Sequence, residues 1–168
     1  GLTGTIPKAD HEKVSLQACL GEVVNKLSAS ELQDMEVLSK CHVNVVQMKE
    51  HAEYSNYQSE LTYLTTDKYR MDYVSDLISK IAESGNTLVL VDRIKCGNMI
   101  CERLPEAEFV SGEMKTTDRK DAYDDINTGT NQVVVATYGV AAVGINIPRI
   151  FNLVLIEPGK SFVRVIQS

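Results

Sequence analysis

From residue 86 onward, short continuous apolar runs alternate with segments of helical periodicity. Runs of this kind, rich in β-branched residues, are typical of strands that are buried on both faces of a sheet. The expected strands are Thr87–Val91, Ala107–Val110, Gln132–Thr137 and Asn152–Ile156. The expected helices are Ile94–Leu104, Thr116 to about Asn127, and Ser161–Ser168. Because strand and helix alternate at βαβ spacing, we predict an α/β fold with a parallel sheet that is covered by helices on both faces.

The first 85 residues have a weaker pattern, in which helices are expected to dominate. The expected elements are an amphipathic helix at Val14–Leu27, a short helix capped by Ser30, a strand at Val43–Met48 and a helix at Glu60–Glu83. In the last helix the near four-residue spacing runs through Tyr69, Tyr73, Leu77 and Ile81. Five tyrosines lie between residues 54 and 73. They could stack on bases, but packing in the core and between helices is the interpretation we favour.

The composition is that of an ordinary globular protein. With 168 residues, the chain has room for one compact domain and part of another. Apolar residues make up 43% and charged residues 24%, which excludes a disordered chain. No apolar run is long enough to span a membrane. A net charge of −6 excludes a small, uniformly basic nucleic-acid-binding module, but it does not exclude binding of nucleic acid in a local groove.

The cysteines, at positions 19, 41, 96 and 101, lack the two-residue spacing of a zinc or redox motif. We expect reduced, half-buried thiols and a cytoplasmic protein. The neighbours Cys41 and His42 are interpreted as coincidence rather than as a metal pair, so no metal site is predicted. The chain begins with Gly1 and has nothing like a signal peptide at its start, and we expect it to be an excerpt of a longer protein.

Candidate chemistry gathers where the expected strands end. In a parallel sheet, ligands bind beyond the carboxyl ends of the strands. These ends are followed by Asp92-Arg93, Ser111-Gly112, Thr137-Tyr138-Gly139 and Glu157-Pro158-Gly159. Glycine lets the backbone approach a phosphate, and helix N-termini offer N–H groups to an anion. Cations stand at or just after these ends: Arg93, Lys95, Lys115, Arg119 and Lys120. Spacing alone leaves two interpretations open: a site that could bind an anionic polymer, and a solvated surface with ordinary helix caps.

The segment Ala136–Pro148 is dense in small residues. Because it offers almost no side chain to bury, we expect another group to pack closely on it. The sequence contains neither of the glycine-rich phosphate motifs, G-x-x-x-x-G-K-S/T and G-x-G-x-x-G, and no paired acids that would hold Mg²⁺ at a nucleotide. The histidines, at positions 11, 42 and 51, all lie in the first half of the chain, away from the expected strand ends, which argues against Ser-His-Asp or Cys-His catalysis there.

Five segments, taken in order, resemble motifs of superfamily 2 helicases, and within them of the phage UvsW-type recombination and repair helicases. They are Gly1–Pro7 (motif III), Leu88–Arg93 (motif IV), Val110–Gly112, Val133–Pro148 (motif V) and Val165–Ser168 (the start of motif VI). The third segment, with Arg119 downstream, is similar to the element that contacts the nucleic-acid backbone. The resemblance covers essentially the whole chain, and it implies a RecA-like sheet preceded by a helical connecting segment.

The resemblance also implies a role for each matching position. The element that couples ATP hydrolysis to DNA movement would contain Thr3, Gly4 and Thr5. The ATP cleft between two motor domains would be lined by Gly144, Asn146 and Gln167. The DNA track would include Arg93, Ser111, Gly112, Arg119 and Thr137, the last of these on a phosphate.

The chain departs from the family pattern in three places. Asn146 stands where many relatives carry Asp, and the loop from Thr137 to Asn146 is one residue longer than the common pattern. The chain also stops at Ser168, before the arginine finger of motif VI. Phosphoryl transfer needs Mg²⁺, a phosphate loop and that arginine. The chain alone is therefore predicted not to hydrolyse ATP, and DNA-stimulated turnover by the isolated chain would contradict this.

The resemblance thus implies a fragment of an ATP-dependent DNA helicase or translocase, which in full length uses ATP and Mg²⁺. It would act on branched or forked DNA in recombination, repair or replication, in the host cytoplasm if the protein is phage-encoded. Residues 1–40 would be the tail of a first RecA-like domain and its connection, and residues 41–168 a second RecA-like domain truncated at motif VI. The alternatives are another superfamily 2 motor (a restriction translocase subunit or an RNA helicase) and a non-catalytic α/β nucleic-acid-binding module.

Overall fold

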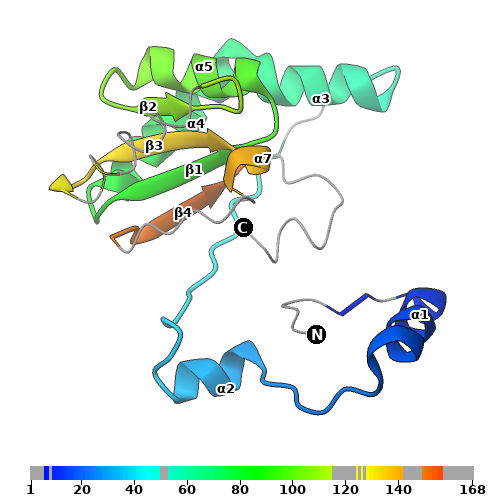
Figure 1. The fold of residues 1–168 in the computed structure, drawn as a ribbon. Helices are drawn as coiled ribbons and strands as arrows, with labels where there is room; N and C mark the ends of the chain where they lie inside the picture. Colours follow the sequence, from blue (N-terminus) through cyan, green and yellow to red (C-terminus); the bar gives the residue numbers. More distant parts are fainter. Residues whose placement is uncertain are drawn as a thin grey trace. The chain divides into compact units, whose positions relative to one another are not determined.

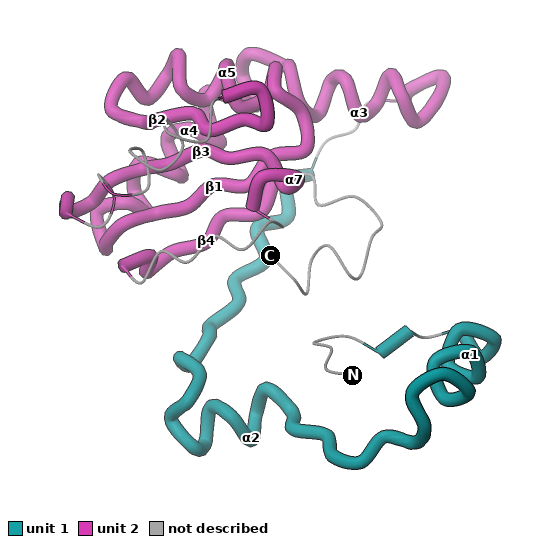
Figure 2. Tube along the Cα trace, in the orientation of Figure 1, with its two compact units in different colours: residues 1–52 teal, residues 53–168 magenta. Residues whose placement is uncertain are grey.

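The computed structural model describes residues 6–7, 9–49, 53–114, 124, 126, 128–141 and 149–156. These residues belong to two compact units, 1–52 and 53–168 (Figure 2). The assignment of residues 1–40 to the tail of a separate motor domain stays a prediction.

A parallel sheet forms the centre of the second unit (Figure 1). Its four strands are β1 (Thr87–Val91), β2 (Glu108–Val110), β3 (Val133–Thr137) and β4 (Asn152–Leu155). Their order across the sheet is β2-β3-β1-β4, and each neighbouring pair is parallel. In the register, Leu90 of β1 lies opposite Ala136 of β3 and Leu155 of β4. The strands predicted from the apolar runs, and their parallel pairing, are confirmed to within one residue at each end.

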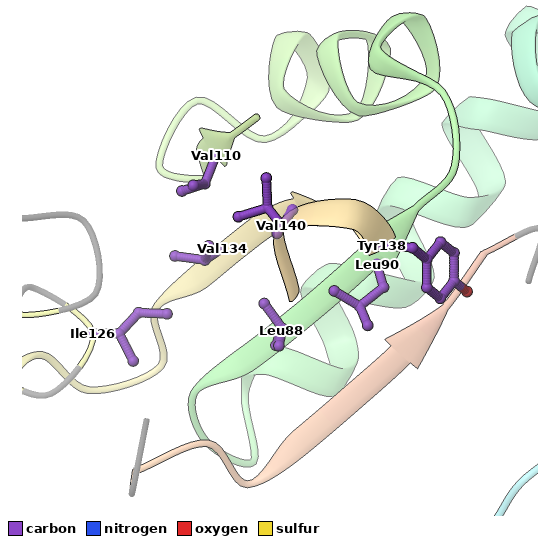
Figure 3. Packing of buried hydrophobic residues seen from close by; sticks show 8 residues of the cluster. Leu88, Leu90, Val110, Ile126, Val134, Tyr138 and Val140 are labelled. Carbon is purple, nitrogen blue, oxygen red and sulfur yellow. The ribbon is translucent and has the colours of Figure 1, made fainter. Parts of the chain in front are cut away.

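Each face of the sheet carries its own apolar core, because side chains alternate along a strand. On one face, Val89 and Val91 of β1 pack with the helices α4 (Lys68–Ala82) and α5 (Ile94–Arg103). On the other face, Leu88 and Leu90 belong to a cluster that includes Ile126 and the short helix α7 (Tyr138–Ala141), as Figure 3 shows. All five residues of β1 are buried. The prediction of helices on both faces is confirmed.

The single helix predicted at Glu60–Glu83 is two helices, α3 (Tyr57–Thr66) and α4. The break lies at Asp67, which has an extended backbone (φ −67°, ψ 132°). The Asp67 side chain accepts a hydrogen bond from the backbone N–H of Arg70 at 2.9 Å, and so caps α4. The Arg70 side chain in turn donates from Nε to the carbonyl of Leu64 near the end of α3, also at 2.9 Å. These local hydrogen bonds outweigh the continuous helical periodicity.

The buried face of α4 also differs from the predicted one. The helix buries Met71, Ser75, Ile78 and Ala82. Tyr69 and Tyr73 are 83% and 51% exposed, and Tyr57 on α3 is 57% exposed. The interpretation of these tyrosines as core residues is therefore wrong, because the side chains that fit against β1 start two positions further along the helix. The Tyr54 and Tyr63 rings do pack together, with centroids 5.2 Å apart.

Helix α5 matches its prediction to within one residue. Gly97 lies in its middle, directly against the ring of Phe109 on β2: a Cβ added at Gly97 would come within 2.7 Å of the ring atom Cζ. At its far end Arg103 donates from Nε to Asp72 of α4 at 2.5 Å. The helix is thus held to the sheet by close backbone approach and to α4 by an ion pair.

Two asparagines join the amino ends of three strands through hydrogen bonds. Asn86, which is 2% exposed, donates from Nδ2 to the carbonyl of Ile126 at 2.8 Å and accepts from the N–H of Gln132 at 2.9 Å. Its backbone carbonyl accepts from the N–H groups of Phe151 and Asn152. The Asn152 side chain donates back to the turn between α4 and β1, reaching the Oγ of Ser84 at 3.0 Å. Strands β1, β3 and β4 therefore begin from one hydrogen-bonded junction.

The first unit contains the helices α1 (Asp10–Leu20) and α2 (Ala29–Asp34), neither of which buries a residue. The predicted helix at Val14–Leu27 ends early, at Gly21, where φ is 83°. Helix α2 is capped by Ser28 rather than by Ser30, through a capping box with Glu31. Hydrogen bonds from the Ser28 backbone and side chain lower the pKa of the Glu31 carboxyl. The strand predicted at Val43–Met48 is not formed.

The four cysteines all lie in the described part of the chain, and none forms a disulfide, as predicted. The expectation of half-buried thiols is wrong for Cys19 and Cys41, which are exposed, and for Cys96, which is buried. Cys101 is intermediate, and burial raises the pKa of its thiol to about 11. None of the described helices is long and apolar enough to cross a membrane.

Candidate nucleic-acid interface

The carboxyl edge of the sheet gathers four of the residues that the sequence singles out. Because the strands are parallel, their carboxyl ends share one edge. Across this edge come Ser111 and Gly112 after β2, Thr137 at the end of β3, and Arg93 after β1. Neighbouring strands lie about 4.8 Å apart, so these positions span roughly 10 Å. The prediction that the residues share an edge is confirmed, whereas their binding roles stay predictions.

Arg93 joins β1 to α5 at this edge. It is the N-cap residue of α5, with φ −110° and ψ 130°, and its carbonyl accepts from the N–H of Gly97 at 3.2 Å. The first turn of α5 holds no acidic residue and includes the exposed Lys95. A helix N-terminus carries a partial positive charge. The two cations and the helix end therefore favour an anion here, although the exposed Asp92 contributes one opposing charge.

The turn after β2 lies against the segment after β3. Ser111 is 7% exposed, and its carbonyl accepts from the N–H of Met114 at 3.2 Å. The neighbouring Gly112 is exposed, and a Cβ added there would lie 4.0 Å from a methyl carbon of Val140 in α7. This is an ordinary van der Waals distance, so the fold itself tolerates a side chain at Gly112. Its exposed backbone remains accessible to a ligand.

Residues 137–141, the described part of the segment after β3, differ from the prediction that this segment has almost no side chain to bury. Thr137 is half-buried at the strand end, and the following Tyr138 and Val140 are 4% and 7% exposed. They belong to the apolar cluster of Leu88 and Leu90. Between them, Gly139 is exposed, and a Cβ added there would meet nothing within 4 Å. The segment therefore buries alternate side chains in the core and presents its backbone at the intervening glycine.

The other predicted site residues lie outside the described residues. They are Thr3, Gly4, Thr5, Lys115, Arg119, Lys120, Gly144, Asn146, the strand-end segment Glu157-Pro158-Gly159, and Gln167. The predicted helix at Ser161–Ser168 is also outside them. Within the ranges that the structure describes, no group of three or more His, Cys, Asp or Glu residues could hold a metal ion. Sequence reasoning missed the burial of Tyr138; its signal is a single aromatic residue within a run of Ala, Gly and Val.

Residues 69–168 match the family model of the helicase conserved C-terminal domain, which is more than half of the chain. The chain belongs to the helicase C-terminal domain family. Over its full length it is also similar to the ATP-dependent DNA helicase UvsW of Enterobacteria phage T4, with 23% identity. The chain spans 36% of that helicase, or about a third of its length.

Solved structures of helicases share the fold of this domain. The crystal structure of T4 UvsW is similar with a TM-score of 0.60 and 24% identity, over 67% of this chain and 24% of that one. Dbp5 of S. cerevisiae, bound to RNA and ADP BeF3, is similar with a TM-score of 0.51 and 20% identity, over 61% of this chain and 28% of that one. The RecA-like fold and the resemblance to a UvsW-type superfamily 2 helicase C-terminal domain are thereby confirmed.

Proposed function

We propose that the chain is part of an ATP-dependent DNA helicase or translocase that acts on branched or forked DNA in recombination, repair or replication. The observation that carries the proposal is the shared edge at which Arg93, Ser111, Gly112 and Thr137 meet, in a chain of the helicase C-terminal domain family. The similarity to UvsW, a DNA helicase by name, supports DNA as the substrate class.

In this proposal the edge holds the sugar-phosphate backbone of DNA. Arg93 supplies a positive charge, and the hydroxyl of Thr137 donates a hydrogen bond to a phosphate oxygen. The exposed backbone at Gly112 and Gly139 allows close approach of the DNA strand. Such contacts fix position on the nucleic acid without reading its sequence. This suits a motor that moves along DNA of any sequence.

ATP and Mg²⁺ are the proposed substrate and cofactor of the full-length protein. Gly144, Asn146 and Gln167 would face the ATP cleft, and Thr3, Gly4 and Thr5 would couple hydrolysis to movement. These residues lie outside the described residues, so the proposal for them is carried by the motif resemblance. The chain by itself is expected to bind DNA without hydrolysing ATP.

Fluorescence anisotropy of labelled oligonucleotides tests the DNA-binding part of the proposal. The purified chain is titrated into a forked DNA, a single strand, a duplex and an RNA of the same sequence, each at several salt concentrations. The variant Arg93→Gln removes a charge at the carboxyl edge. The matched control Lys80→Gln also removes one positive charge, but in the last turn of α4, which leads into the opposite, amino end of β1.

We expect DNA binding by the wild-type chain, tightest for the fork. Arg93→Gln should weaken it several-fold and lower the slope of log Kd against log salt by about 0.7–0.9, the contribution of one phosphate contact. Lys80→Gln should leave both quantities unchanged. Equal effects of the two variants on affinity and on the salt slope would refute the assignment of the carboxyl edge as the DNA-binding surface. Tighter binding of RNA than of any DNA would favour an RNA helicase instead.

A further inference from the structure

The residue next to Thr137 is the largest side chain that the segment after β3 places in the core. Tyr138 is 4% exposed and is the first residue of the four-residue helix α7. It belongs to the cluster that includes Leu90 and Val140. Figure 3 shows its ring next to Leu90, on the face of the sheet opposite to α4 and α5. The backbone that leaves β3 is therefore anchored within one residue of Thr137.

The neighbours of Tyr138 contribute smaller side chains to this anchor. Ala136, the preceding residue on the same face of β3, is small, and it lies opposite Leu90 in the register. Gly139 has no side chain, and Ala141 is only partly buried. Val140 is buried, but it is smaller and lies three residues beyond Thr137. Among residues 138–141, Tyr138 thus places the largest side chain in the core where the chain leaves the sheet.

We propose that Tyr138 is a positioning residue for nucleic-acid binding. Its ring fixes the exit of the chain from β3, and this holds the hydroxyl of Thr137 where a phosphate binds. The inference rests on the proposed function, because it needs DNA to bind at this edge. It differs from a purely structural role, since it requires the effect of Tyr138 to pass through Thr137.

The test combines binding and stability measurements on the isolated chain. A fluorescein-labelled single-stranded oligonucleotide is the probe, and urea titrations establish conditions in which every variant is folded. Tyr138→Ala removes the ring, and Tyr138→Phe keeps it. Leu88→Ala is the matched control, because Leu88 is 6% exposed in the same cluster but lies near the amino end of β1. If Tyr138→Ala does not fold, Tyr138→Leu takes its place.

We expect Tyr138→Ala to weaken DNA binding about tenfold, the equivalent of one hydrogen bond to a charged group. Tyr138→Phe should bind DNA with wild-type affinity. Leu88→Ala should lower the urea midpoint without weakening DNA binding. Thr137→Val alone should also weaken binding about tenfold. The double variant with Tyr138→Ala should then lose no more than about tenfold, because residues that act as one unit are not additive.

Three results would overturn the inference. One is equal loss of affinity in Tyr138→Ala and Leu88→Ala, which would show a general effect of stability. Another is an additive loss of about a hundredfold in the double variant, which would show that Tyr138 acts independently of Thr137. The third is no binding of the oligonucleotide by the folded wild-type chain, which would refute the proposed function as well. The first two leave the proposed function intact.

Discussion

Replacing Asn86 by alanine should be among the most damaging single changes to this fold. The side chain is 2% exposed, and it forms two short hydrogen bonds, to the carbonyl of Ile126 and from the N–H of Gln132, at 2.8 and 2.9 Å. A third contact, to the carbonyl of Gly129 at 3.3 Å, is long and therefore weaker. Alanine removes all three and provides no replacement for the groups left behind.

The expected loss follows from the groups that remain unpaired. A buried donor or acceptor without a partner costs about 1–3 kcal/mol. Two such groups together give a loss of about 2–6 kcal/mol, against a total of about 5–15 kcal/mol for a typical domain. With a urea dependence of about 2 kcal/mol per molar, the middle of the usual range, the unfolding midpoint should fall by roughly 1–3 M.

The measurement is a urea titration followed by far-UV circular dichroism and by tyrosine fluorescence, since the chain has no tryptophan. The matched control is Asn98→Ala, because Asn98 is an exposed asparagine on α5 in the same unit. Alanine is the better helix former there, so this control should be neutral or slightly stabilising. A midpoint for Asn86→Ala within about 0.3 M of the control would refute the assignment of Asn86 as the junction of the strands.

Three further variants and one labelling experiment test other parts of the chain. Gly97→Ala should destabilise the fold by about 1–3 kcal/mol, because its Cβ would overlap the ring of Phe109; adding Phe109→Leu should recover part of this in a urea titration. Ser75→Ala should be neutral or stabilising, since the buried Ser75 hydroxyl has no partner among the described residues; a clear loss of stability would show that this hydroxyl does form a hydrogen bond. At pH 8 the Cys101 thiol, with its pKa raised to about 11, should react with iodoacetamide at least roughly tenfold more slowly than an ordinary thiol, as mass spectrometry would show. Arg119→Glu in the intact protein should weaken DNA binding and flatten its salt dependence; unchanged affinity across salt would remove Arg119 from the DNA track.

The strands could be predicted because their burial leaves a direct mark on the sequence. A run such as Thr87–Val91 is apolar throughout, since both faces of β1 are covered. The break at Asp67 could not be predicted from periodicity, because it depends on single hydrogen bonds of Asp67 and Arg70. The same holds for the start of α2, where a capping box two residues before the expected cap decides the boundary.

The position of the candidate interface could also be predicted from the sequence. The side-chain packing that holds its backbone in place could not. Parallel pairing alone places Arg93, Ser111 and Thr137 at one edge, because this placement does not depend on their side-chain contacts. The burial of Tyr138 depends instead on the space that the cluster around Leu90 provides. No local sequence pattern shows that space, since it is created by strands and helices that are distant in the chain.

The two edges of the sheet therefore differ in what a substitution should affect. At the amino edge, the side chains of Asn86 and Asn152 are used in hydrogen bonds within the fold, so changes there should act on the free energy of unfolding. At the carboxyl edge, Gly112 and Gly139 are exposed, and neither position needs glycine for its backbone angle or for space. Alanine at Gly139 should even favour the helical turn of α7. A loss of DNA binding without a loss of stability, confined to the carboxyl edge, is thus what distinguishes a nucleic-acid interface from an ordinary loop region.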